Sequence, residues 1–150
     1  MLDALDADAV RRWSRVALES MRAHQAEIDA INVFPVPDAD TGTNLLLTLL
    51  VADDAVRAGA TASAGAVLAD LSRAAVLGAR GNSGVIVSQV LRGFAEAAEG
   101  TETIDAKTFC RGLRRGAELA DAAVAQPVDG TILTVAHAAA AGVADARGRS

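Results

Sequence analysis

The sequence predicts an all-α fold in which about six helices pack as an antiparallel bundle, in one domain spanning residues 1–150. Apolar residues recur at steps of three and four along most of the chain, whereas no segment shows sustained alternation with period two. Hydrophobic residues make up 51% of the chain and aromatic residues only 3%, so the core must form from Leu, Val, Ile and Ala at close helix–helix approach. Runs of Gly, Pro, Asp and Asn separate the periodic segments. We therefore expect helices joined by loops, and no β-sheet.

The first half of the chain contains three predicted helices. The first covers about Asp8–Asp29, and the second begins where Thr41 or Thr43 is a natural N-cap. The third covers Ala64–Leu77. The apolar stripe of the first helix, which should face the core, is formed by Val10, Trp13, Ala17, Met21 and Ile28.

The second half contains three more. The fourth helix is expected over Val85–Ala98, after a glycine-rich interruption. Asp105 can cap the fifth helix, and the sixth is expected over about Thr131–Ala146. The apolar stripe of the fifth helix is formed by Phe109, Leu113, Ala117, Ala120 and Val124.

Composition excludes several classes of protein. The net charge of −5 argues against a nucleic-acid-binding surface, which needs a basic patch. The longest strongly apolar run, Leu45–Val51, is far shorter than the ~20 residues needed to span a bilayer. Acidic residues precede any apolar stretch at the N-terminus, which is unlike a secretory signal. A single cysteine, Cys110, excludes an internal disulfide and fits a reducing compartment. We expect a cytoplasmic protein.

Three loops carry most of the Gly, Pro, Asp and Asn residues between the helices: residues 32–44, 78–84 and 126–131. They connect the first helix to the second, the third to the fourth and the fifth to the sixth. Alternate connections of an up-and-down bundle lie at the same end. The unusual chemistry of the chain should therefore converge at one end of the bundle.

The first loop, NVFPVPDADTGTN, has Asp38 and Asp40 two residues apart. In an extended segment both side chains would point the same way, and two carboxylates so close repel unless a cation lies between them. Oxygen ligands without a Cys or His cluster suit Mg²⁺ better than Zn²⁺, and Mg²⁺ usually shares its shell with phosphate oxygens. The alternative is that the two acids only cap the following helix and oppose its dipole.

The other two loops place glycines at the start of a helix. Gly81, Asn82, Ser83 and Gly84 open the fourth helix, where missing side chains and free amides suit a phosphate. The structural alternative is a helix–helix turn with Ser83 as an ordinary N-cap. Gly130 and Thr131 open the sixth helix, and by themselves they read as a glycine turn followed by an N-cap.

A P-loop is excluded because the chain has no G-x-x-x-x-G-K-[ST] pattern and its only lysine, Lys107, lies in a predicted helix. A Rossmann site is excluded because no strand precedes the glycines. If the protein handles phosphates, a metal must neutralise most of their charge. This requirement favours the interpretation of Asp38 and Asp40 as metal ligands.

Together, the motifs INVFPVPDADTGTN, GARGNSGVIVSQ and PVDGTILTVA closely resemble the nucleotide-binding domain of bacterial fatty-acid kinases. That domain belongs to the larger group typified by the L domain of dihydroxyacetone kinase (DhaL-like). The resemblance covers nearly the whole chain, from about Asp8 to Ala146, and the first motif is the most specific.

The resemblance implies an all-α barrel that binds ATP and Mg²⁺ at one end. Asp38 and Asp40 would hold the metal between the ATP phosphates, and they are the residues expected to act in catalysis. The other residues expected to bind the cofactors are Asn32, Thr41, Thr43, Asn44, Gly81, Asn82, Ser83, Gly84, Gly130 and Thr131.

Three departures from the family pattern stand out. The dihydroxyacetone-kinase relatives carry a third aspartate upstream, for which Asn32 is the nearest counterpart here. Ala39 stands where the fatty-acid kinases usually have glycine, and alanine calls for a φ below zero. The family domain has about eight helices, whereas this chain offers six. The full kinases also carry further domains.

The sequence thus favours an ATP- and Mg²⁺-dependent kinase domain that phosphorylates a fatty-acid carboxylate presented by an acyl-binding partner protein. One alternative is a nucleotide-binding subunit of a dihydroxyacetone (glycerone) kinase, which the NVFPVPD form of the first motif disfavours. Another is a nucleotide-binding or interaction module without catalytic activity. Assembly as a homodimer stays open.

Overall fold

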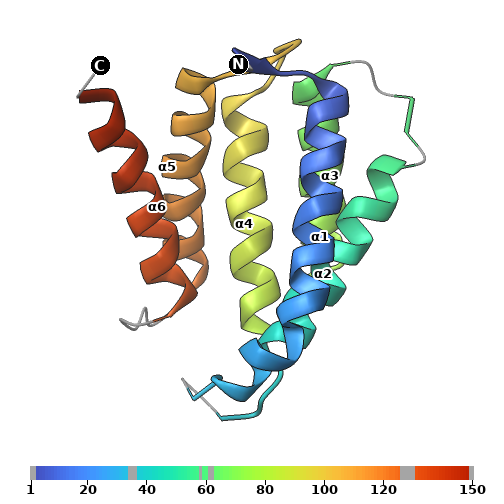
Figure 1. Cartoon of the computed structure of the whole chain (residues 1–150), viewed down its shortest axis with the longest axis vertical. Coiled ribbons are helices and arrows are strands. Elements are labelled where there is room, and N and C mark those ends of the chain that lie inside the picture. Colours follow the sequence, from blue (N-terminus) through green and yellow to red (C-terminus); the bar gives the residue numbers. More distant parts are fainter. Residues whose placement is uncertain (1–2, 34–36, 58, 61–62, 126–130, 149–150) are drawn as a thin grey trace.

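The predicted all-α fold is confirmed. The computed structural model describes residues 3–33, 37–57, 59–60, 63–125 and 131–148, and six helices lie in these ranges. The helices run alternately up and down (Figure 1). None of the described helices is long and apolar enough to cross a membrane. The helices are α1 (Ala7–Ala30), α2 (Thr41–Arg57), α3 (Ala64–Leu77), α4 (Gly81–Ala97), α5 (Ala106–Ala123) and α6 (Ile132–Gly148).

Side-chain caps explain where three of the helices begin. Asp6 accepts a hydrogen bond from the amide of Ala9 at 2.7 Å and starts α1, and Ser63 caps α3 in the same way. The predicted cap of α5 is confirmed, since Asp105 accepts from the Thr108 amide at 2.7 Å. The fourth helix starts earlier than predicted, at Gly81, because the glycine-rich segment forms its first turn.

The expectation of no β-sheet was wrong, because a two-stranded sheet joins the first described residues to the start of α5. Strand β1 (Ala4–Leu5) pairs with β2 (Ile104–Asp105) in antiparallel register, with Ala4 opposite Asp105 and Leu5 opposite Ile104. Two residues are too few to show any alternation of apolar and polar side chains. Hydrophobic periodicity therefore cannot predict strands as short as these.

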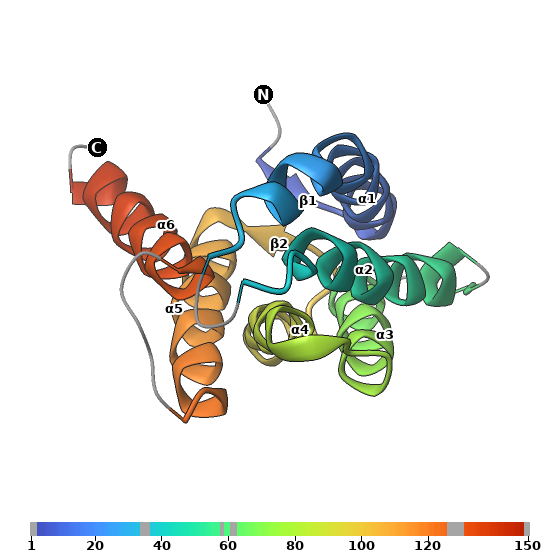
Figure 2. The ribbon, with the colours of Figure 1, turned by 90° about the horizontal axis from the view of Figure 1, so that it is seen from below.

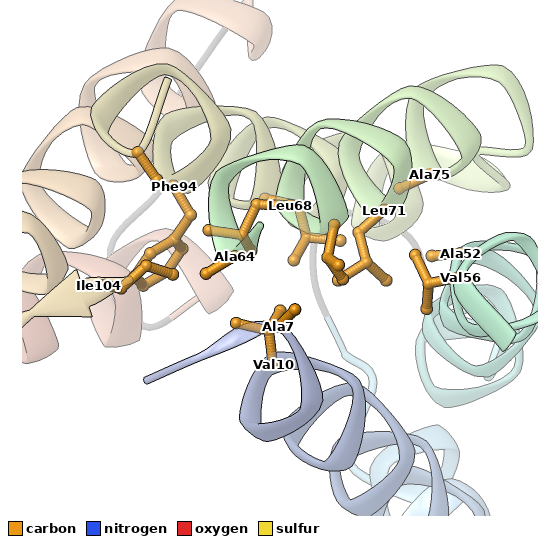
Figure 3. Packing of buried hydrophobic residues seen from close by; sticks show 13 residues of the cluster. Ala7, Val10, Ala52, Val56, Ala64, Leu68, Leu71, Ala75, Phe94 and Ile104 are labelled. Carbon is orange, nitrogen blue, oxygen red and sulfur yellow. The ribbon is translucent and has the colours of Figure 1, made fainter. Parts of the chain in front are cut away.

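The main hydrophobic core lies among α1, α2, α3 and α4 (Figure 3). Its largest fully buried apolar side chains are Leu68, Leu71, Val10 and Val67. A second, smaller cluster of Ile86, Ala120 and Leu133 joins α4, α5 and α6. Seen from below, the helices follow one another around an arc with α1 and α6 at its two ends (Figure 2). This order sets which helix ends are neighbours at the lower side of the molecule.

The buried face of α1 differs from the predicted stripe. Val10 is buried as expected, but Trp13 is 40% exposed, and the face continues through Ser14 and Leu18. Ser14 faces inward because its hydroxyl donates to Oδ1 of Asp53 at 2.9 Å, and Asp53 is only 2% exposed. A buried carboxylate requires a hydrogen-bond donor, and this requirement outweighs the apolar periodicity of α1.

Helices α4 and α5 approach each other through glycines. A Cβ atom on Gly93 would overlap the backbone of Gly116, and one on Gly116 would lie 2.9 Å from the carbonyl oxygen of Val90. A Cβ atom on Gly112 would come within about 3.1 Å of Phe94 Cα. The composition predicted close helix–helix approach because aromatic side chains are few. At these glycines the backbones of α4 and α5 are in direct contact, as that prediction requires.

We expect Gly93→Ala to lower the free energy of unfolding by at least ~1–3 kcal/mol, because the added methyl group forces the two helix backbones apart. Gly142→Ala is the matched control. It makes the same change within a helix, but its methyl group would meet nothing within 4 Å, so it should stabilise the protein by up to ~1 kcal/mol. Urea denaturation followed by circular dichroism measures both. Equal effects of the two substitutions would contradict the close packing of α4 on α5.

Candidate functional site

Two of the three loops singled out in the sequence lie at the same end of the bundle. The described parts of the α1–α2 and α3–α4 connections are at the lower end of the molecule, opposite the β-sheet (Figure 1). The third loop, including Gly130, lies outside the described residues. Thr131 is described, and its carbonyl oxygen accepts from the Val135 amide at 3.4 Å as α6 begins. Leu133 of the same turn packs on Ile86 of α4. The start of α6 is therefore next to the start of α4.

The two aspartates of the first loop have different surroundings. Asp38 is exposed, and its Oδ1 accepts a hydrogen bond from Nδ2 of Asn32 at 2.7 Å. Asp40 is half-buried, and its carbonyl oxygen accepts the Asn44 amide at 2.8 Å, which starts α2. Asn32, Asp38 and Asp40 thus gather where the loop enters α2.

The backbone between the two aspartates is a bend. Ala39 has φ = +54°, so the expectations of a negative φ and of an extended segment were both wrong. Alanine in this left-handed region costs ~1–2 kcal/mol, because its Cβ crowds the following carbonyl oxygen. A glycine would adopt this φ freely. The two carboxylates are therefore not turned to one side by an extended backbone.

The cap of α2 comes from another helix. Thr41 is the first helical residue and Thr43 lies within the first turn, so neither is the side-chain cap that the sequence predicted. Instead, Asp29 of α1 accepts the Thr43 amide on Oδ1 at 3.0 Å and the Thr43 hydroxyl on Oδ2 at 2.8 Å. Sequence reasoning missed Asp29, since its partner is 14 residues away and no local pattern relates the two.

The carboxylate of Asp29 is stabilised in its charged form. Burial raises the pKa of Asp29, but hydrogen bonds from the hydroxyl and amide of Thr43, from Gln25 and from the Gly42 amide together hold it below its usual value. Gln25 donates through Nε2 to Oγ1 of Thr43 at 2.8 Å and, more weakly, to Oδ2 of Asp29 at 3.4 Å. The last turns of α1 are thus tied to the first turn of α2.

The glycine-rich start of α4 packs directly against the start of α2. Gly81 has φ = +59°, which favours glycine, and a Cβ there would overlap the side-chain amide of Asn44 unless that side chain moved. Ser83 does not act as an N-cap: its hydroxyl donates to the carbonyl oxygen of Thr41 at 3.4 Å. Arg80 holds the N-cap position without a side-chain cap bond, so the first amides of α4 are left without such a partner.

Thr48 fastens the two loops together. It is completely buried, donates to the carbonyl oxygen of Asn44 at 2.8 Å and accepts the Arg80 amide at 3.1 Å. A Cβ on Gly84 would overlap the same hydroxyl. The result is one continuous surface in which Gly81 and Asn82 are exposed beside the half-buried Asn44.

The donor set of this end suits a weakly held cation beside an anion. Across the described parts of the chain, His, Cys, Asp and Glu side chains form no group of three or more that could hold a metal ion. A cation at Asp38 and Asp40 would therefore take its remaining ligands from water or from a bound anion, as Mg²⁺ commonly does. The uncapped first turn of α4 offers backbone amides to the same anion.

Ala39→Gly should raise the free energy of unfolding by ~0.5–1 kcal/mol. It removes the ~1–2 kcal/mol cost of left-handed alanine, partly offset by the ~0.4–1 kcal/mol effect of glycine on the unfolded chain. Ala139→Gly, on the exposed side of α6, is the matched control and should destabilise by ~0.5–1 kcal/mol. Urea denaturation compares them, and a loss of stability at residue 39 as large as that at residue 139 would contradict the strained bend.

The stabilisation that Asp29 contributes should depend on pH. Because its pKa is lowered by folding, this contribution is present above the ordinary value of 3.8 and is lost as the pH falls through the folded-state pKa. The stability difference between the wild type and Asp29→Asn should therefore be largest at neutral pH and shrink below about pH 4. Denaturant unfolding at a series of pH values measures it. A difference that stays constant into the acid range would rule out this role of the carboxylate.

Comparison with known proteins shows to which family the chain belongs. Residues 35–150 match the family model described as the DAK2 domain. Protein YloV of Bacillus subtilis (strain 168) is 45% identical over 136 residues, which cover 91% of this chain and 25% of YloV. An uncharacterized protein of Staphylococcus saprophyticus is 44% identical over 140 residues, covering 93% of this chain and 25% of that protein. The chain spans about a quarter of the length of these curated relatives. It belongs to the DAK2 domain family, which is part of the dihydroxyacetone kinase family.

Proposed function

We propose that the chain binds ATP with Mg²⁺ at the lower end of the bundle and is the nucleotide-binding part of a kinase. One observation carries the proposal: the uncapped, glycine-rich first turn of α4 lies against the first turn of α2, which directly follows Asp38 and Asp40. An anion site and a pair of carboxylates thus share one surface. Membership of the DAK2 family supports the nucleotide as the anion.

The phosphates of the nucleotide are proposed to lie at the start of α4. Backbone amides at a helix N-terminus attract anions, and Gly81, the first residue of α4, is exposed. Asn82 adds an exposed polar side chain to the same turn, whereas Ser83 and Gly84 are buried and are proposed to support the turn from within. The chain has no P-loop lysine, so these groups position the phosphates without neutralising them.

Asp38 and Asp40 are the residues proposed to hold Mg²⁺. With Asn32 bonded to Asp38, they offer an open set of oxygen donors and no cage, which fits a cation that keeps water and shares phosphate oxygens. When bound, Mg²⁺ would neutralise charge on the phosphates during transfer. Thr41, Thr43 and Asn44 are proposed to support the site from the first turn of α2, and Thr131 from the start of α6. The same role is proposed for Gly130.

The proposed acceptor is a fatty-acid carboxylate presented by an acyl-binding partner, on the strength of the NVFPVPD motif. A carboxylate oxygen would form a bond to the γ-phosphorus while the bond from that phosphorus to the β–γ bridging oxygen breaks. ADP would leave with the electron pair, and an acyl phosphate would form. A carboxylate is already deprotonated near neutral pH, so the reaction needs no general base, and catalysis is by positioning and electrostatic stabilisation.

Replacing either aspartate should abolish tight nucleotide binding. We expect Asp38→Ala and Asp40→Ala to lower the affinity for ATP in excess Mg²⁺ by more than the ~10–100-fold typical of residues that only support a metal ligand, because these would be the ligands themselves. Isothermal titration calorimetry measures the dissociation constants.

Asp54→Ala is the control, since it removes an acid from the other end of α2, where Asp54 pairs with Arg57 at 3.5 Å. It should bind ATP as the wild type does. Unchanged affinity in both loop variants would refute the proposed metal site. Tight ATP binding without phosphoryl transfer to any acyl-loaded partner would instead favour a nucleotide-binding module without catalytic activity.

A further inference from the structure

We infer that Asp29 is the positioning residue of this site: it clamps the loop that carries Asp38 and Asp40 in the shape needed for Mg²⁺ and ATP. The inference rests on the proposed function. It adds Asp29 to the site residues that the sequence motifs indicated.

The clamp is bidentate and joins two helices. Both oxygen atoms of Asp29, in the last turn of α1, are bonded to Thr43 in the first turn of α2, at 3.0 Å to the amide and 2.8 Å to the hydroxyl. Gln25, one turn earlier in α1, donates to the same hydroxyl at 2.8 Å. The Thr43 hydroxyl thus gives its single proton to Asp29 and accepts one from Gln25.

The helices at this clamp are in direct contact. A Cβ on Gly42 would overlap the carbonyl oxygen of Gln25 and lie 3.0 Å from Oδ1 of Asp29. Glycine at this position lets the amide edge of α2 reach the carboxylate. The separation of α1 and α2 at the clamp is therefore set by contact between backbones and has little freedom to change.

The clamp closes the loop at both ends. Asn32, which bonds to Asp38 at 2.7 Å, lies three residues after Asp29. Asp40, whose carbonyl oxygen starts α2, lies three residues before Thr43. Both proposed metal ligands are thus connected to the clamp by short stretches of chain. Misplacing a reacting group by about 1 Å can cost ~10²-fold in activity, so loosening the clamp should be felt at the metal.

Asp29 is proposed to act by positioning and not as a third metal ligand, because both of its oxygen atoms already accept hydrogen bonds from Thr43. A carboxylate has about four lone-pair sites. Oδ1 of Asp29 accepts from the Thr43 amide, and Oδ2 accepts from the Thr43 hydroxyl and, at 3.4 Å, from Gln25. A cation at Asp29 would have to displace these donors.

The charge of Asp29 also makes the N-terminal ends of α2 and α4 differ in their attraction for an anion. The N-terminal ends of α2 and α4 both carry partial positive charge and would both attract an anion. Asp29 occupies the end of α2 with a carboxylate, whereas the end of α4 has no side-chain cap. The arrangement directs phosphate toward α4 and leaves the loop before α2 to the cation.

Asp29→Asn tests the inference, because it keeps the size of the side chain but removes its charge and one acceptor oxygen. We expect it to raise the dissociation constant of ATP roughly 10–100-fold in excess MgCl₂ and to leave the weaker binding in EDTA little changed. Asp105→Asn is the matched control: it removes a carboxylate that caps α5 at 2.7 Å from Thr108 N, at the other end of the molecule. It should bind ATP as the wild type does in both buffers. Titrations are made where denaturation curves show every variant to be folded.

Substitutions at Thr43 provide an independent arm that also serves if Asp29→Asn does not fold. Thr43→Val removes the hydroxyl and keeps the amide, and should weaken binding as Asp29→Asn does, whereas Thr43→Ser should restore it. The double variant Asp29→Asn with Thr43→Val should lose no more affinity for ATP than either single variant, because the two residues act through one interaction. Additive losses would mean that Thr43 contacts the nucleotide directly, and would overturn the inference.

The outcomes separate this inference from the proposed function. Wild-type protein that binds ATP with Mg²⁺ while Asp29→Asn binds equally well would refute the clamp and leave the proposed function standing. Equal losses in MgCl₂ and in EDTA would also refute it, since the clamp acts on the metal-binding loop. Wild-type protein without Mg²⁺-dependent ATP binding would refute the proposed function, and the inference with it.

Discussion

The bond between Asp29 and the first turn of α2 is the interaction on which the lower end of the molecule depends. It satisfies an amide at the start of a helix, keeps a carboxylate charged and fixes the distance across a long loop. A helix usually obtains its cap from the residue just before it, and such a cap makes the helix locally stable. A cap supplied by another helix instead makes the start of α2 depend on tertiary packing. Local and global structure are thereby coupled at the candidate site.

The position of α4 is set by close contacts between its backbone and the neighbouring helices. Thr48 joins α2 to the α3–α4 turn, while Gly84 and Gly81 bring the first turn of α4 against α2. Farther along, Gly93 brings α4 against α5. A core with few aromatic side chains has little bulk to separate its helices, so backbone contacts set their spacing. The two surfaces proposed to bind metal and phosphate are therefore held relative to each other by contacts that tolerate little addition of volume.

The features that repeat along the chain could be predicted from the sequence, and the features that join distant residues could not. The bounds of α3 and the cap at Asp105 follow from local patterns, and so does the convergence of the first two loops, which needs only alternating helix directions. Asp29 was missed because its role exists only after α1 and α2 pack. The inward turn of Ser14 was missed for the same reason, since its partner Asp53 lies on another helix. The positive φ of Ala39 goes against the preference of alanine, so it could not be predicted from the residue type.

The left-handed bend at Ala39 has a consequence for the chirality of the loop. A backbone region that disfavours an L-residue is the ordinary region of its mirror image, so a D-amino acid at this position would adopt φ = +54° without a steric conflict at Cβ. Glycine reaches the same conformation only by giving up rigidity in the unfolded chain. D-alanine introduced by chemical ligation would combine the relaxed backbone with the conformational restriction of a side chain. At position 39 the backbone conformation of the fold therefore suits a D-amino acid better than an L-amino acid.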